Sequence, residues 1–161
     1  MSDPLVHAMV GDWIGETLAK LPDKRLNNGF LAAVLAFGSH AWLDMVDQDY
    51  TPNWVAWRKD AARLRKDLPY IALQIMGLAA TLVSICREKD KQVIQTRLAG
   101  VLGALAPDII DGVYAYLNPQ AWQKGELILP WHRAAANGKQ VLTREQAICR
   151  TAYLTLLQLR F

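Results

Sequence analysis

The chain has 161 residues and a mass of 18.0 kDa, which suits one domain and leaves little room for two. Apolar residues make up 52% of it and charged residues 20%, so the chain can bury a core, and wholesale disorder is excluded. The formal net charge is only +3, which lacks the strong basic field of a nucleic-acid-binding protein. We therefore expect no specific nucleic-acid partner.

The sequence predicts helices throughout, because alternation of β-branched and polar residues is scarce. Thr143 and Gln146 form a capping-box pattern that marks the start of the last helix. A long irregular segment is expected at 118–142, and a break or restart is expected at Pro107. We predict one all-α domain over residues 1–161, a bundle of about six helices at 4–20, 29–46, 52–67, 69–86, 91–117 and 144–160.

Two long stretches carry no charged side chain, residues 26–43 and residues 68–86. Their lengths approach the ~20 apolar residues that cross a bilayer. Polar residues such as Gln74, Thr81 and Ser39 interrupt them, so we interpret both stretches as buried core helices. We accordingly expect a cytoplasmic protein, with membrane spans or a peripheral membrane contact as the alternative. The sequence makes no prediction of oligomeric state.

The three histidines each lie near an acidic residue in an otherwise apolar segment. His40 and Asp44 are four residues apart, so they share one face of a predicted helix. Burying a carboxylate is costly unless it is paired or binds a metal. A metal-binding pair and a hydrogen-bonded structural pair both satisfy this condition.

A second group of acids follows Pro107, which suits the first turn of a helix. Asp108 and Asp111 are three residues apart and share a face, so they repel each other unless a cation or a proton lies between them. His7 lies near the start of the first helix and His132 lies in the long irregular segment. Each of these features alone has a plain structural interpretation.

Together they favour a metal site, because histidines and carboxylates from several helices are how an all-α domain builds one. The absence of a thiolate near these motifs indicates a divalent ion held by nitrogen and oxygen. We expect zinc first, with manganese and iron as the alternatives.

Two motifs resemble a known family. The Ser-His-x-x-x-Asp motif contains His40 and Asp44 and is followed by Thr51-Pro52. It resembles the SHxxxD and TP motif of the membrane-bound metal-dependent hydrolases. It is also similar to the helical HxxxD motif of the zinc-dependent phospholipase C and nuclease group. The Pro-Asp-x-x-Asp at 107–111 resembles their LLPDxD motif, and His132-Arg133 is similar to their HR element. The order of the first two motifs is reversed here, and the acids are three residues apart instead of two. The resemblance implies a metal ligand set of His40, Asp44, Asp108, Asp111 and His132, with His7 as an amino-terminal ligand.

On this basis we predict a metal-dependent hydrolase that acts on a phosphoester, in a small phosphorylated or lipid-like substrate. The ion would activate a water molecule, and Asp111 or Asp47 would orient that water as the catalytic carboxylate. The alternative is a non-enzymatic helical binding or structural module, whose partners would bind the basic helix that contains Trp54, Trp57 and Lys59.

Overall fold

α-Helices account for all the regular secondary structure in the computed structural model, which describes residues 4–46, 60–124, 126–132 and 142–159. The all-α class and the approximate number of helices predicted from the sequence are therefore confirmed for this part of the chain. The helices are α1 (Pro4–Ala19), α2 (Gly29–Val46), α4 (Ala61–Cys86), α5 (Lys91–Leu117), α6 (Pro119–Lys124) and α8 (Arg144–Leu159).

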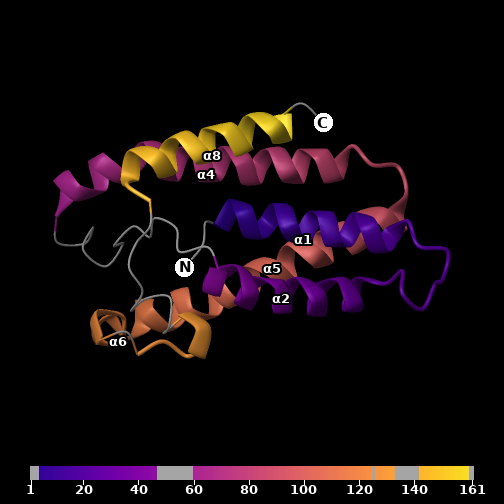
Figure 1. Ribbon diagram of the computed structural model, residues 1–161, viewed down its shortest axis with the longest axis horizontal. Helices are drawn as coiled ribbons and strands as arrows, with labels where there is room; N and C mark the ends of the chain where they lie inside the picture. The colour runs from indigo at the N-terminus through magenta and orange to yellow at the C-terminus, as the bar shows by residue number, and fades with distance from the viewer. Residues whose placement is uncertain (1–3, 47–59, 125, 133–141, 160–161) are drawn as a thin grey trace.

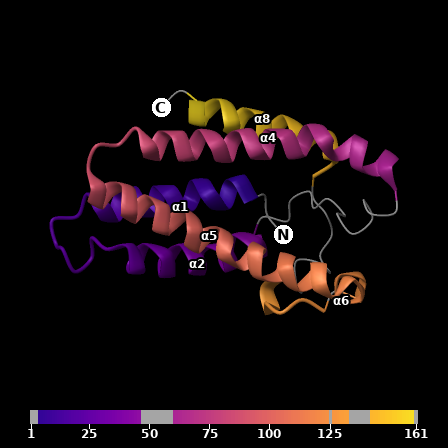
Figure 2. The ribbon, with the colours of Figure 1, turned by 180° about the vertical axis from the view of Figure 1, so that it is seen from behind.

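The long helices lie side by side in two groups (Figure 1). Helices α1, α2 and α5 pack together in one group, and α4 pairs with α8 in the other. Seen from behind, α5 crosses in front of α1 and α2 (Figure 2). The loop that joins α1 to α2 and the loop that joins α4 to α5 lie at one end of the molecule, and α6 lies at the other end.

Glycines let α1 and α5 approach each other closely. A Cβ atom at Gly100 would overlap with the backbone carbonyl oxygen of Gly11, and a Cβ atom at Gly15 would lie 2.5 Å from the carbonyl oxygen of Thr96. Only a residue without a side chain fits such a backbone contact. This packing fixes the position of α1 against the middle of α5.

Polar side chains join the two groups of helices. Arg97 of α5 donates two hydrogen bonds to Asp12 of α1, from Nε to Oδ1 at 2.7 Å and from Nη2 to Oδ2 at 2.8 Å, and a third from Nη2 to Ser84 of α4 at 3.1 Å. The backbone N–H of Leu5 donates to Oε1 of Gln74 at 3.0 Å. Fork-to-fork pairing of a guanidinium with a carboxylate fixes orientation as well as distance, so α1 is held in register with α4 and α5.

Two predicted breaks are wrong, because α4 runs through Pro69 and α5 runs through Pro107. Proline removes one helical hydrogen bond and distorts the preceding turn, and packing of the rest of the helix outweighs this cost. The segment at 118–142 is also more regular than predicted, since it contains α6 and a helical turn at 130–132. The predicted capping box is confirmed: the N–H of Gln146 donates to Oγ1 of Thr143, and the N–H of Thr143 donates to Oε1 of Gln146.

Helices α4 and α5 are both long and apolar enough to cross a membrane, and they are the two helices among the described residues that meet this condition. Only 33% of the most apolar stretch of α4 and 39% of that of α5 is buried inside the protein. The interpretation of residues 68–86 as a buried core helix therefore describes only one side of α4, and its other side is exposed.

Candidate metal centre

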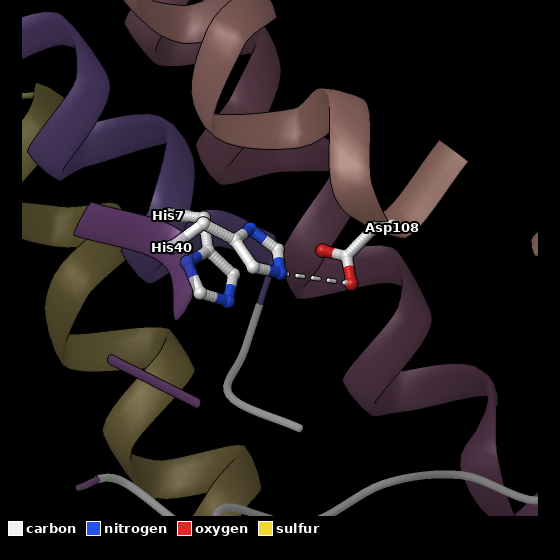
Figure 3. A group of neighbouring side chains, drawn as sticks. All are labelled: His7, His40 and Asp108. Carbon is white, nitrogen blue, oxygen red and sulfur yellow. Dashed lines mark ion pairs between the residues drawn. The ribbon is translucent and has the colours of Figure 1, made fainter. Parts of the chain in front are cut away.

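Five of the six predicted ligands converge at one point between α1, α2, α5 and the helical turn at 130–132. His7 comes from α1, His40 and Asp44 come from α2, Asp108 comes from α5, and His132 comes from the turn. Figure 3 shows His7 and His40 stacked, with His40 directed at Asp108. Side chains up to 125 residues apart in the sequence thus form one cluster, which we call the His/Asp cluster.

The carboxylate of Asp44 lies at the middle of the cluster. Its Oδ2 atom is 2.8 Å from Nε2 of His132 and 3.2 Å from Nε2 of His40, and its Oδ1 atom is 3.3 Å from Nε2 of His7. Oδ1 of Asp108 lies 3.7 Å from Nε2 of both His40 and His132. Two overlapping sets of three ligand atoms are close enough to hold a metal ion, one made by His7, His40 and Asp108 and the other by His40, Asp44 and His132.

The imidazole of His40 is oriented by α5. Its Nδ1 lies 2.6 Å from the carbonyl oxygen of Ala104, which can only accept a hydrogen bond, so Nδ1 carries the proton. Its Nε2 atom then has a free lone pair that faces the cluster. Pro107 lies three residues further along α5, inside the same helix. The sequence offers no signal for this backbone contact.

The imidazole of His132 is oriented by Asp111. Its Nδ1 donates to Oδ2 of Asp111 at 2.5 Å, and the same carboxylate accepts the backbone N–H of Ile128 at 2.7 Å and that of Leu129 at 3.3 Å. A carboxylate in this role fixes the tautomer and raises the basicity of a ligating histidine. Asp111 therefore lies behind His132, and its contacts do not favour the ligand or water-orienting roles predicted for it.

An aromatic contact positions the turn that carries His132. The rings of Trp131 and Phe37 meet edge to face, with centroids 5.9 Å apart at 88°. Such a contact adds to the apolar burial of both rings. The only signal for Trp131 in the sequence is its position directly before His132.

The lone pairs of two imidazole nitrogens lie close together in the buried His/Asp cluster. Nε2 of His40 and Nε2 of His132 are 2.8 Å apart, and in the neutral tautomers that Ala104 and Asp111 favour both nitrogens present a lone pair. The side chains of His7, His40, Asp44 and His132 are fully buried. Electron-rich atoms repel each other at this distance unless a cation or a proton lies between them. The arrangement fits a divalent ion, because imidazole nitrogens and carboxylate oxygens are its ordinary ligands.

The pKa of His132 is affected by the same neighbouring groups. Burial lowers the pKa of His132, but the hydrogen bond to Asp44, the charges of Asp44 and Asp108 and the bond to Asp111 outweigh it. The net effect raises the pKa of His132 above its ordinary value of 6.5. Without a metal ion, the cluster thus tends to hold a proton at the place where a cation is favoured.

The other predicted residues have different outcomes. Asp47, the second candidate for the catalytic carboxylate, and Trp54, Trp57 and Lys59 of the predicted basic helix lie outside the described residues. Asp12, near the predicted amino-terminal ligand, forms its ion pair with Arg97 and belongs to the packing of α1 against α5.

Comparison with known proteins identifies no relative of the chain. No family model, no curated protein and no solved structure matches the chain.

Proposed function

We propose that the His/Asp cluster binds a divalent metal ion and that the protein is a metal-dependent hydrolase of a phosphoester. The observation that carries the proposal is the convergence of Nε2 of His40, Nε2 of His132 and Oδ2 of Asp44 within 3.2 Å of one another, with both imidazoles oriented from behind. Oriented nitrogen and oxygen ligands without a thiolate are typical of catalytic sites that hold zinc or manganese.

The chemistry follows from the charge of the ion. A bound divalent ion lowers the pKa of a water molecule and neutralises the charge that develops on phosphoryl oxygens. The chain itself would supply the ligands and the orientation: Asp44 lies between the three histidines, and Asp111 holds His132 in the tautomer that leaves its Nε2 free. Zinc is the first choice and manganese the second, because two or three neutral imidazoles with carboxylates suit both ions.

The test is hydrolysis of bis(p-nitrophenyl) phosphate and p-nitrophenyl phosphate by protein purified without a metal-binding tag. We expect activity after addition of zinc or manganese, its loss with a chelator, and a loss of at least about 100-fold in His40→Ala, since a metal ligand is removed. Ser39→Ala is the matched control, because Oγ of Ser39 donates to the carbonyl of Ala36 and takes no part in the cluster. Equal activity in His40→Ala and Ser39→Ala would contradict the proposal.

A further inference from the structure

Two neighbouring cavities lie between helices of both groups. The larger has a volume of about 600 Å³, and its lining includes the charged side chains Asp12, Glu16, Arg87, Glu88 and Arg97. The smaller has a volume of about 290 Å³, and most of its lining is apolar, with Met76, Val83 and Leu159. Ser84, Arg87 and Gln158 line both cavities, so the two are adjacent. A single ligand with a polar end and an apolar end can therefore occupy them together.

The two cavities are separate from the candidate metal centre. None of the residues of the His/Asp cluster lines either cavity. On α1, His7 of the cluster and Glu16 of the larger cavity are nine residues apart, which is about 14 Å along the helix at about 1.5 Å per residue. A ligand in the cavities would thus form a second site, whose occupancy does not depend on the proposed function.

The guanidinium of Arg97 is held in a fixed orientation at the larger cavity. Its side chain is only 9% exposed, and its Nε and Nη2 atoms donate two hydrogen bonds to Asp12 and one to Ser84. These bonds use three of the five N–H groups of a guanidinium. The two N–H groups of Nη1 have no partner among the described residues, so they remain free to donate to a ligand in the cavity that Arg97 lines.

The carboxylates at the larger cavity all have partners, whereas its second arginine does not. Asp12 accepts from Arg97, Glu16 accepts from Nζ of Lys20, and Glu88 accepts the two backbone N–H groups that follow it. Arg87, which follows the last residue of α4, is exposed, and its guanidinium has no hydrogen bond within the part of the chain that the structure describes. The free donors therefore belong to guanidinium groups, whose planar geometry matches a carboxylate. The three neighbouring acids favour a ligand with one negative charge over a doubly charged phosphate.

The smaller cavity suits an apolar chain. Met76 and Val83 of α4 and Leu159 of α8 line it, and their exposed fractions are 54%, 49% and 60%. An apolar chain that covers such side chains removes apolar surface from water, which strengthens binding by up to about four-fold per CH₂ group. The arginines and these apolar side chains thus contact opposite ends of one ligand.

We propose that the two cavities bind one small carboxylate that carries an apolar chain. Its carboxylate accepts hydrogen bonds from Arg87 and from Nη1 of Arg97, and its chain lies against Met76, Val83 and Leu159.

Isothermal titration calorimetry of the full chain with octanoate tests the proposal. We expect saturable binding of one octanoate per chain, at least about 10-fold weaker binding of octanol, which lacks the charge, and at least about 30-fold weaker binding of acetate, which lacks the chain. Equal binding of octanoate and octanol would overturn the role of the arginines. Tighter binding of octyl phosphate than of octanoate would overturn the carboxylate, and binding of many octanoate molecules per chain would overturn a defined site.

Variants locate the site. Arg87→Gln removes the free guanidinium, and Ala79→Trp fills the smaller cavity from an exposed position on its lining. Arg65→Gln is the matched control, because Arg65 is an exposed arginine of α4 that lines neither cavity. We expect octanoate to bind at least about 10-fold more weakly to the first two variants and with unchanged affinity to the control, while thermal melts confirm that all three fold. Equal affinity of the folded variants and wild type would overturn the proposal.

Discussion

At the scale of single residues, the site contains side chains that face one another and groups that contact the far side of the imidazoles. His40, His132 and Asp44 direct atoms at one another, whereas Asp111 and the carbonyl of Ala104 contact the far side of the imidazoles. A group behind a ligand affects metal binding through the orientation and basicity of that ligand. Substitution of a predicted ligand and substitution of a group behind a ligand are therefore expected to have different effects on metal binding.

Asp111→Asn tests the role of the rear carboxylate. The amide retains the shape of the side chain but loses its charge, so His132 is held less firmly in the ligating tautomer. We expect zinc affinity to fall about 10- to 100-fold, with binding still measurable. Competition with a fluorescent zinc chelator measures this. Complete loss of zinc binding would assign Asp111 as a ligand itself, and an unchanged affinity would contradict the positioning role.

The raised pKa of His132 predicts an unusual pH dependence for the metal-free protein. A histidine whose pKa is higher in the folded state stabilises the fold below about 6.5, its pKa in the unfolded chain, and this stabilisation is lost as the pH rises through the folded-state pKa. Melting of the chelator-treated protein should therefore shift to lower temperature between about pH 6 and about pH 8.

Zinc should reverse this trend, because the ion must displace the proton from the imidazole and binds more tightly as the pH rises. The difference in melting temperature between zinc-loaded and metal-free protein should thus be larger at about pH 8 than at about pH 6. A zinc effect that is independent of pH would contradict binding through His132.

At the scale of elements, close contact between α1 and α5 positions His7 opposite the part of α5 that carries Asp108. Gly100→Ala tests this contact, because the added methyl group meets the backbone of Gly11, which cannot move aside without shifting α1. We expect a loss of about 1–3 kcal/mol in the free energy of unfolding and weaker zinc binding.

Gly38→Ala is the control for this substitution. Nothing lies within 4 Å of a Cβ atom at Gly38, so the change should leave zinc binding unaltered and stabilise α2 by up to about 1 kcal/mol. Thermal melts of both variants make the comparison. Equal stability of Gly100→Ala and Gly38→Ala would show that α1 and α5 are less closely packed than described.

The helices and much of the cluster follow from the sequence, because both depend on local spacing. The four-residue interval between His40 and Asp44 places both side chains on one helix face, and the structure has them there. Pro69 and Pro107 predict helix breaks that the structure does not have, because tertiary packing overrides the local preference of proline. The role of Asp111 depends on the turn at 128–132, whose position no local spacing predicts.

At the scale of the whole molecule, a buried polar cluster lies between helices whose outward faces, on α2 and on much of α4 and α5, are apolar. Each of α2 and α5 has one face that contributes to the cluster and another that is exposed and apolar. Helices α2 and α5 therefore provide both predicted metal ligands and an exposed apolar surface.

The central claim is that the folded His/Asp cluster binds a divalent ion, and a thermal melt of wild type and His40→Ala, each with chelator and with zinc, tests it most directly. An ion that binds only the folded state stabilises it by about 2.7 kcal/mol at 100 times its dissociation constant, which corresponds to a shift of roughly 5–10 °C for a chain of this size. We predict that zinc raises the melting temperature of wild type by this amount and that the rise disappears in His40→Ala. A wild-type melting temperature that responds to neither zinc nor chelator would contradict the claim.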